Sequence, residues 1–201
     1  KGKNTGGMGA YSPSRLINNE LEKKIINKII NPTLKGLSEM GSEYKGFLYT
    51  GLMIVENEPF LIEYNVRMGD PECQTILPIL DTDLAEIILA CCNKKLQNID
   101  IKWKNKKSVC IVLCSNGYPD NYKKNIIING LKNLKIEKDE YIFHAGTVIK
   151  DDKYLATGGR VLNVIVTTEN FKNSKEKAIK ILNDLDWKDG FFRKDIAYKV
   201  T

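Results

Sequence analysis

The sequence predicts a mixed α/β fold of the α+β type, in which antiparallel strands and helices build two consecutive domains, residues 1–106 and 107–201. Two of the three observations behind this prediction concern periodicity. Apolar residues recur at helical spacing in some segments and alternate or run continuously in others, with turn residues between neighbouring strands. The third is a polar stretch without periodicity from Asn98 to Lys107, which marks the boundary between the domains.

The first domain opens with a glycine-rich loop and continues with an amphipathic helix from Asn19 to Glu39. Pro32 is expected to kink or divide this helix, and Gly41 to end it. Two strands follow, at Tyr44–Val55 and Pro59–Arg67, and the short polar connection between them predicts a hairpin.

Two further helices complete the first domain. One follows Asp70 and ends near Pro78, and the other begins at Asp81 or Thr82 and ends near the lysines at 94 and 95. The second helix is expected to turn its apolar residues inward, namely Leu84, Ile87, Ile88, Leu89 and Cys92.

The second domain is predicted to be a small mixed β/α unit. Its strands are expected at residues 108–114, 126–128, 141–145, 147–149 and 161–167, and its last helix at Ser174–Asp184. Thr157, Gly158 and Gly159 predict a hairpin turn between strands.

Composition excludes several classes of protein. The 201 residues contain 42% hydrophobic and 28% charged residues, which is ordinary for a soluble globular protein. The apolar runs are too short to cross a membrane and no secretory signal opens the chain, so we expect a cytoplasmic protein without a membrane partner. The net charge of +6 contains no dense basic block, which argues against a nucleic-acid partner. The five cysteines are expected to be reduced core thiols.

The most informative segment is the strand that carries Glu63, Asn65 and Arg67. Side chains alternate along a strand, so these three are expected to lie in one row. A carboxylate and an amide oxygen can hold Mg²⁺, and a guanidinium can bind a phosphate in a bidentate manner. The simpler alternative is the solvated face of an amphipathic strand. Asp70 as N-cap and Pro71 at the first helical position favour the phosphate site.

Three other places have both a structural and a functional interpretation. The backbone of the loop Asn4–Gly9 could surround an anion, although it lacks the ending of a Walker loop and could be an ordinary turn. Arg160 follows the glycine turn and could either shape the turn or bind an anionic ligand. His144, the one histidine, is interpreted as a hydrogen-bonded structural residue rather than a catalyst.

Several motifs, in order, resemble a known family. These are N-T-G-G-M-G-A-Y-S-P from Asn4, G-F-L-Y-T-G-L-M-I from Gly46, E-Y-N-V-R-M-G-D-P-E-C-Q from Glu63, F-H-A-G-T from Phe143, T-G-G-R-V-L from Thr157 and R-x-D-I-A-Y from Arg193. Together they resemble phosphoribosylamine–glycine ligase (glycinamide ribonucleotide synthetase) over essentially the whole chain. That family belongs to the ATP-grasp ligases, so the resemblance implies the C-terminal part of an ATP-grasp domain followed by the family's C-terminal domain.

The resemblance implies a reaction and a role for each site residue. ATP phosphorylates the carboxylate of glycine, and the amine of 5-phosphoribosylamine attacks the acyl phosphate to give glycinamide ribonucleotide. Glu63 and Asn65 would ligate Mg²⁺ (or Mn²⁺), and Arg67 would stabilise the transferring phosphoryl group. Leu61, expected on the face of Glu63, could lie under the nucleotide, and the simpler interpretation is a leucine of the core. The substrate pocket would be lined by Asn4, Thr5, Gly6, Gly7, Met8, Gly9, Gly69, Asp70 (as a catalytic residue) and Arg160.

Family members are about twice as long as this chain and carry an N-terminal domain and a lid over the phosphates. We therefore expect a fragment that needs a missing N-terminal half as its partner and that alone neither binds ATP well nor turns over. Two alternatives remain. One is another ATP-grasp ligase with a different acid substrate, and the other is a non-catalytic docking module or half of a split enzyme.

Overall fold

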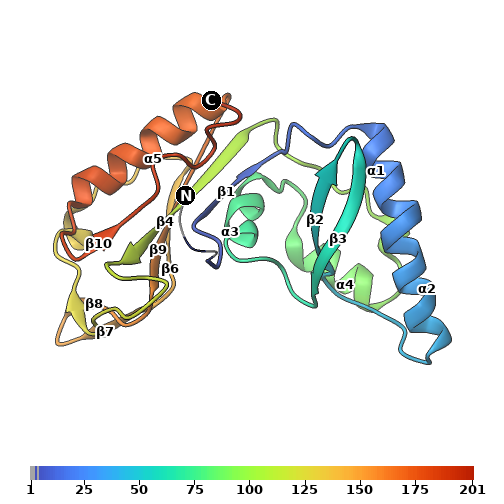
Figure 1. The fold of residues 1–201 in the computed structure, drawn as a ribbon, viewed down its shortest axis with the longest axis horizontal. Coiled ribbons are helices and arrows are strands. Elements are labelled where there is room, and N and C mark those ends of the chain that lie inside the picture. Colours follow the sequence, from blue (N-terminus) through green and yellow to red (C-terminus); the bar gives the residue numbers. More distant parts are fainter. Residues whose placement is uncertain (1–2, 4) are drawn as a thin grey trace. The chain divides into compact units, whose positions relative to one another are not determined.

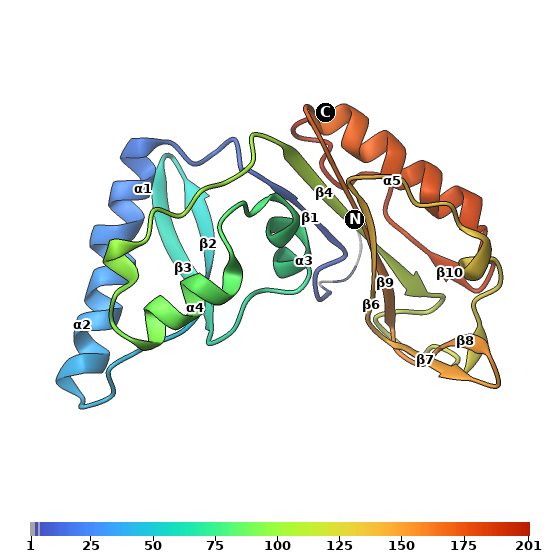
Figure 2. The ribbon, with the colours of Figure 1, turned by 180° about the vertical axis from the view of Figure 1, so that it is seen from behind.

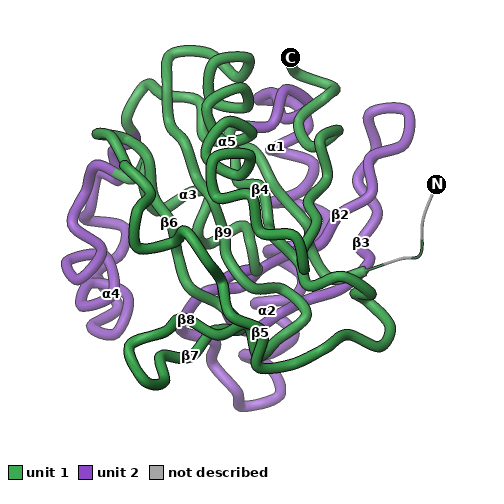
Figure 3. The backbone as a smooth tube through the Cα atoms, turned by 90° about the vertical axis from the view of Figure 1, so that its left-hand side faces the viewer, with its two compact units in different colours: residues 1–13, 70–80, 104–201 green, residues 14–69, 81–103 purple. Residues whose placement is uncertain are grey.

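The computed structural model describes residues 3 and 5–201, which divide into two compact units (Figure 3). Unit 1 comprises residues 1–13, 70–80 and 104–201, and unit 2 comprises residues 14–69 and 81–103. The predicted domains are sequential stretches, so they divide the chain differently from these units, and they stay a prediction.

Unit 1 is built on a five-stranded antiparallel sheet with β4 near its centre. The strands pair in the order β1-β4-β9-β6, and β10 also pairs with β4. Their bounds are Gly9–Ser12 for β1, Lys107–Ser115 for β4, Glu140–His144 for β6, Arg160–Thr168 for β9 and Gly190–Phe191 for β10. The predicted strands at 108–114, 141–145 and 161–167 are thereby confirmed.

Both faces of this sheet are covered, which explains the continuous apolar run in β4. The helix α5 (Phe171–Leu185) lies along one face, as Figure 1 shows, and alternate residues of β4 from Val109 to Leu113 pack into the core cluster that contains its buried side chains. The residues between them belong to a second cluster with Met8 and Ile165. A strand buried on both sides has no polar face to alternate with.

The remaining elements of unit 1 are short. They are α3 (Glu72–Ile76), the 3₁₀ turns Leu77–Ile79 and Leu131–Asn133, and a three-stranded sheet of β5 (Ile126–Ile127), β8 (Lys153–Ala156) and β7 (Thr147–Lys150). The segment from Thr157 to Gly159 joins β8 to β9, which lie in different sheets. The prediction of a hairpin turn there is wrong, because two strands that do not pair cannot form a hairpin.

Unit 2 begins with a long helix in three parts: α1 (Asn19–Ile25), a π-helical turn (Ile26–Ile30) and α2 (Asn31–Glu39). The Asn18 side chain caps α1 by accepting from the N–H of Leu21 at 2.9 Å. The π turn comes just before Pro32, where a missing N–H interrupts the regular ladder. Gly41 follows the helix with φ of +76°, as its predicted role requires.

The sheet of unit 2 is a hairpin of β2 (Tyr49–Val55) and β3 (Glu58–Asn65), with α1 packed beside β3 (Figure 2). Glu56 and Asn57 connect the strands, both with positive φ. This is the left-handed pair typical of a tight hairpin, so the predicted connection is confirmed.

The last helix of unit 2 is α4 (Leu84–Cys92), which is followed by a 3₁₀ turn at Leu96–Asn98. Asp83 caps α4 through the N–H groups of Ala85 and Glu86. Of the residues expected to face inward, Ile87 is buried, whereas Ile88, Leu89 and Cys92 are exposed. That expectation is wrong because this short helix buries only a narrow stripe in the described unit. No helix of the described residues is long and apolar enough to cross a membrane.

Candidate functional site

Glu63 and Asn65 lie on one face of β3, as the alternation predicts. The Nδ2 of Asn65 donates to the Oε1 of Glu63 at 3.2 Å. On the paired strand, Gly51 lies opposite Glu63, and a Cβ at Gly51 would be 3.0 Å from the Cγ of Glu63. The absent side chain therefore leaves room for the Glu63 carboxylate. A glycine inside a strand is the signal that sequence analysis overlooked at this position.

Arg67 does not belong to this row. β3 ends at Asn65, and the Nη1 of Arg67 donates to the carbonyl oxygen of Met68 at 2.8 Å. The expectation of a strand that extends to Arg67 is wrong. Alternation between faces is imposed by the pairing with β2, and the pairing stops at the partners Tyr49 and Asn65.

Leu61 lies on the opposite face of the hairpin from Glu63. The register shifts between Gly51 and Leu52, so that Leu52 pairs with Leu61 and Ile62 is an extra residue of β3. One extra residue reverses the alternation beyond it. The expectation that Leu61 shares the face of Glu63 is therefore wrong, although its side chain is 44% exposed.

The pair of Glu63 and Asn65 fits a divalent cation that brings most of its own ligands. It offers two oxygen-bearing side chains on an exposed strand, and rotation of the Asn65 amide would turn its oxygen toward Glu63. Among the residues that the structure describes, no group of three or more acidic, histidine or cysteine side chains is placed to hold a metal. Mg²⁺ suits such a site because it is commonly held by one or two protein oxygens together with phosphates and water.

In unit 1, Arg160 contacts two other predicted substrate residues, Asp70 and Gly7. Its Nη2 pairs with the Oδ2 of Asp70 at 2.7 Å, and its Nη1 donates to the carbonyl oxygens of Asp70 at 2.8 Å and Gly7 at 3.2 Å. The second carboxylate oxygen of Asp70 accepts from Gln74 at 2.9 Å. Arg160 therefore binds the carboxylate of Asp70 and links it to the glycine loop at Gly7.

Asp70 is not the N-cap of the following helix, so that prediction is wrong. Helix α3 begins at Glu72 with Pro71 in the cap position, and no described side chain caps it. The carboxylate of Asp70 is engaged by the guanidinium of Arg160 instead, a stronger partner than a backbone N–H. Gly69, the preceding residue, is buried in unit 2.

The glycine loop has both structural and open parts. Asn4 lies outside the described residues. Met8 is buried, and its carbonyl accepts from the N–H of Val112 at 3.1 Å. Gly9 starts β1, where a Cβ would be 2.8 Å from the carbonyl oxygen of Cys110, so packing explains this glycine. Thr5 and Gly6 precede the strand, and binding of a substrate by this loop stays a prediction.

His144 has a structural partner, in line with its interpretation from the sequence. Its Nδ1 shares a hydrogen bond of 2.8 Å with the hydroxyl of Thr147, and its ring stacks on Tyr154 with centroids 5.3 Å apart. Two cysteines of the core are equally unsuited to catalysis. Burial raises the pKa of Cys110 and of Cys114 to about 12, so both remain protonated thiols.

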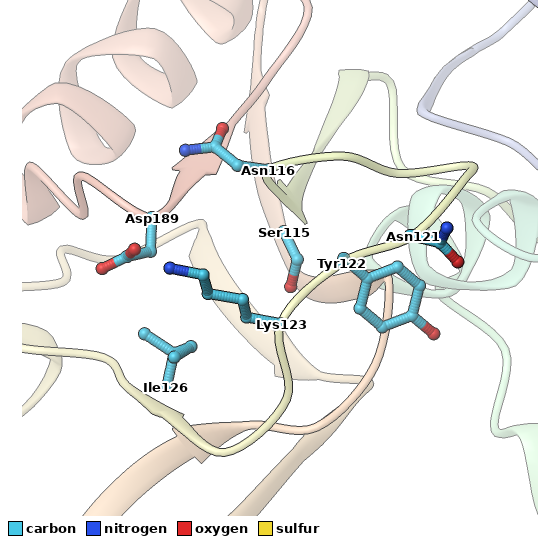
Figure 4. A pocket seen from close by; sticks show the side chains of 7 residues that line it. All are labelled: Ser115, Asn116, Asn121, Tyr122, Lys123, Ile126 and Asp189. Atoms are coloured by element: carbon cyan, nitrogen blue, oxygen red, sulfur yellow. The ribbon is translucent and has the colours of Figure 1, made fainter.

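A cavity of about 470 Å³ lies in unit 1 beside the end of β4 (Figure 4). Its lining residues are Ser115, Asn116, Asn121, Tyr122, Lys123, Ile126 and Asp189. The Ser115 hydroxyl donates to the carbonyl of Gly158 at 2.9 Å, which anchors the glycine turn that precedes Arg160. None of these residues was singled out from the sequence.

Two family models match the chain. Residues 1–73 match the phosphoribosylglycinamide synthetase ATP-grasp (A) domain, and residues 108–199 match the phosphoribosylglycinamide synthetase C domain. Similar curated proteins are the phosphoribosylamine–glycine ligases of Brucella melitensis, 39% identical over 200 residues, and Fusobacterium nucleatum, 41% identical over 197 residues. The alignments cover 100% and 98% of this chain but 47% and 46% of those proteins, so the chain spans about half the length of the curated relatives it matches.

Solved structures agree with the sequence matches. The crystal structure of phosphoribosylamine–glycine ligase from Thermotoga maritima superposes with a TM-score of 0.82 at 32% identity, covering 98% of this chain and 48% of that one. The biotin carboxylase domain of a thermophilic 2-oxoglutarate carboxylase shares only the fold, with a TM-score of 0.62 at 15% identity over 88% of this chain and 39% of that one. The predicted mixed fold of ATP-grasp type is confirmed, and the chain belongs to the phosphoribosylglycinamide synthetase family.

Proposed function

We propose that this chain forms part of a phosphoribosylamine–glycine ligase. The whole protein would join glycine to 5-phosphoribosylamine in an ATP-consuming reaction that yields glycinamide ribonucleotide, ADP and phosphate. The observation that carries the proposal is the contact of Glu63 with Asn65 above Gly51, which offers a two-ligand cation site on the hairpin. Membership of the family supports the choice of reaction.

The proposed chemistry needs neutralisation of phosphate charge more than a covalent catalyst. Glu63 and Asn65 would hold Mg²⁺ or Mn²⁺, and the bound ion would supply positive charge to the ATP phosphates. Arg67, just beyond the strand, would stabilise the phosphoryl group as the glycine carboxylate becomes an acyl phosphate.

The other predicted residues would serve the substrates. Asp70 and Arg160, already paired with each other, would order the loop Asn4–Gly9 and Gly69 along the pocket. We also propose that residues 1–106 belong to the ATP-grasp domain and 107–201 to the C domain. The rest of the ATP site would come from the half of the relatives that this chain does not match, and the enzyme would act in the cytoplasm.

A chimera tests this function, with this chain replacing the matching segment of the Fusobacterium nucleatum relative. We expect the chimera to form glycinamide ribonucleotide in the presence of Mg²⁺, and Glu63→Gln to lower the rate by about 100-fold or more, because it removes the only negative charge of the two proposed ligands. Glu86→Gln is the matched control, since Glu86 is an exposed glutamate of the same unit on α4. Paramagnetic broadening by Mn²⁺ at the amides of Glu63 and Asn65 gives a second readout on this chain alone.

Two results would contradict the proposal. Equal rates for Glu63→Gln and Glu86→Gln would contradict the cation site at Glu63. A folded chimera that is active on a different carboxylic acid would instead identify another ATP-grasp ligase. The 201-residue chain alone is expected to show no ligase turnover, because it covers less than half of its relatives.

A further inference from the structure

Tyr118 places its hydroxyl beside the glycine loop and Arg160, all within unit 1. A Cβ at Gly6 would lie 3.1 Å from the hydroxyl oxygen of Tyr118 and 3.7 Å from the Nε of Arg160. The hydroxyl and one edge of the guanidinium therefore face the same small volume above Gly6. No motif in the sequence pointed to this tyrosine, which follows Gly117 in a turn.

The ring of Tyr118 is fixed by packing rather than by its hydroxyl. A Cβ at Gly159 would lie 2.3 Å from the ring Cδ2, so the ring rests directly on that glycine. The ring also packs against the apolar cluster that contains Met8 and Cys114. Within the part of the chain that the structure describes, the hydroxyl has no hydrogen-bond partner. It is held in place and is available to a ligand.

The open groups around Gly6 are donors. Arg160 uses Nη1 and Nη2 for its bonds to Gly7 and Asp70, which leaves its Nε–H available. The backbone N–H groups of Gly6 and Gly7 donate to no described residue. The carboxylate that contacts Arg160, that of Asp70, is already engaged in an ion pair with it. A cluster of donors without a free acceptor selects an oxygen-rich anion.

We propose that the hydroxyl of Tyr118 and the Nε–H of Arg160 bind the phosphate of a phosphorylated sugar above Gly6. This inference deepens the proposed function and rests on it, because the proposed substrate carries such a phosphate. Phosphate oxygens accept from hydroxyl, guanidinium and amide donors at once. The Tyr118 hydroxyl would add a hydrogen bond to a charged group, and its orientation would be set before the ligand arrives.

The test uses the 201-residue chain and ribose 5-phosphate as the probe. We expect millimolar ribose 5-phosphate to shift the amide resonances of Gly6, Gly7 and Gly159, and Tyr118→Phe to raise the dissociation constant about tenfold. Phenylalanine keeps the ring on Gly159, so the fold should be retained. Tyr122→Phe is the matched control, because that ring also packs on Gly159, whereas the atoms nearest to a Cβ at Gly6 belong to Tyr118 and Arg160 and not to Tyr122. Figure 4 shows the Tyr122 side chain among the residues that line the cavity.

Further arms keep the inference falsifiable. Gly6→Ala should weaken binding as Tyr118→Phe does, since its methyl group would occupy the proposed phosphate position. Inorganic phosphate should shift the same amides and ribose should not. The proposal is overturned if wild type gives no shifts, if ribose alone gives them, or if Tyr118→Phe and Tyr122→Phe bind equally well.

The outcomes also separate this inference from the proposed function. A chimera without ligase activity, combined with ribose 5-phosphate binding that depends on Tyr118, would refute the ligase and retain the phosphosugar site. An active chimera whose Tyr118→Phe variant binds ribose 5-phosphate normally would retain the ligase and refute the role of Tyr118.

Discussion

The two units of the chain differ in how their sheets are stabilised. In unit 1, β4 and β9 are buried almost throughout, under α5 on one face and a second apolar cluster on the other. In unit 2, the hairpin of β2 and β3 leaves large apolar side chains exposed, including Met53, Phe60 and Ile62. Hairpins of two strands are marginal without packing partners. The proposed phosphosugar-binding groups of Tyr118 and Arg160 therefore lie on the well-packed sheet of unit 1. The proposed cation ligands Glu63 and Asn65 lie on the less well-packed hairpin of unit 2.

The largest effect should come from the core of unit 1. Ile111 is fully buried, so Ile111→Ala should lower the free energy of unfolding by about 3 kcal/mol through lost burial and a cavity. Phe60→Ala in unit 2 should cost less than about 1 kcal/mol, because its side chain is 56% exposed. Urea unfolding followed by the fluorescence of buried Trp187, in a Trp103→Phe background, measures unit 1, and the fluorescence of Trp103 in a Trp187→Phe background measures unit 2. Equal costs for the two variants would refute the contrast between the units.

Substitution of two glycines by alanine should change the stability of the two units in opposite directions. Gly159→Ala should destabilise unit 1 by about 2 kcal/mol, because the new methyl group would overlap the ring of Tyr118 at 2.3 Å. Gly36→Ala should stabilise unit 2 by about 0.5–1 kcal/mol, since Gly36 lies inside α2 with no described atom within 4 Å of the added Cβ. Thermal unfolding of both variants gives the signs, and stabilisation by Gly159→Ala would show that Tyr118 is not held by that contact.

A third glycine connects packing to the cation site. Gly51→Ala should push the Glu63 side chain aside, because its methyl group would lie 3.0 Å from the Cγ of Glu63. We expect Mn²⁺ affinity to fall about tenfold, as for residues that orient metal ligands. Gly36→Ala is the control in the same unit. Unchanged Mn²⁺ affinity in Gly51→Ala would mean that the orientation of Glu63 does not depend on the facing glycine.

The sequence predicted the elements of both units better than the geometry of the site. Local patterns identified β4 and α5, because continuous burial and helical spacing are written in neighbouring residues. The extra residue at Ile62 could not be read from alternation, and it moved Leu61 to the other face.

Long-range pairing was the second limit. Arg160 lies 90 residues from Asp70 in the sequence, and no local pattern in either segment predicts their ion pair. Tyr118 was missed for the same reason, since its neighbours Gly6 and Gly159 come from distant parts of the chain. The residues around Asp70 predicted that it caps the following helix, because a sequence pattern shows only the partners that are close along the chain.

The smallest effect concerns the edge of unit 2, where Glu58 pairs with Lys24 at 2.7 Å and with Lys28. Hydrogen bonds from these two ammonium groups lower the pKa of Glu58 from 4.5 to about 2. A lowered pKa means that the carboxylate favours the folded state above the unfolded value, and that this contribution disappears as the pH falls from 4.5 toward 2. The side chain is 41% exposed, so screening by water keeps the effect small.

The difference in unfolding free energy between wild type and Glu58→Gln should therefore shrink between about pH 5 and pH 2. Glu22→Gln, an exposed α1 residue, is the control and should show a smaller pH dependence. A carboxyl ¹³C titration of Glu58 reports the pKa directly. A midpoint at the ordinary value would show that the lysines of the long helix do not hold β3, and that the hairpin depends on its apolar contacts alone.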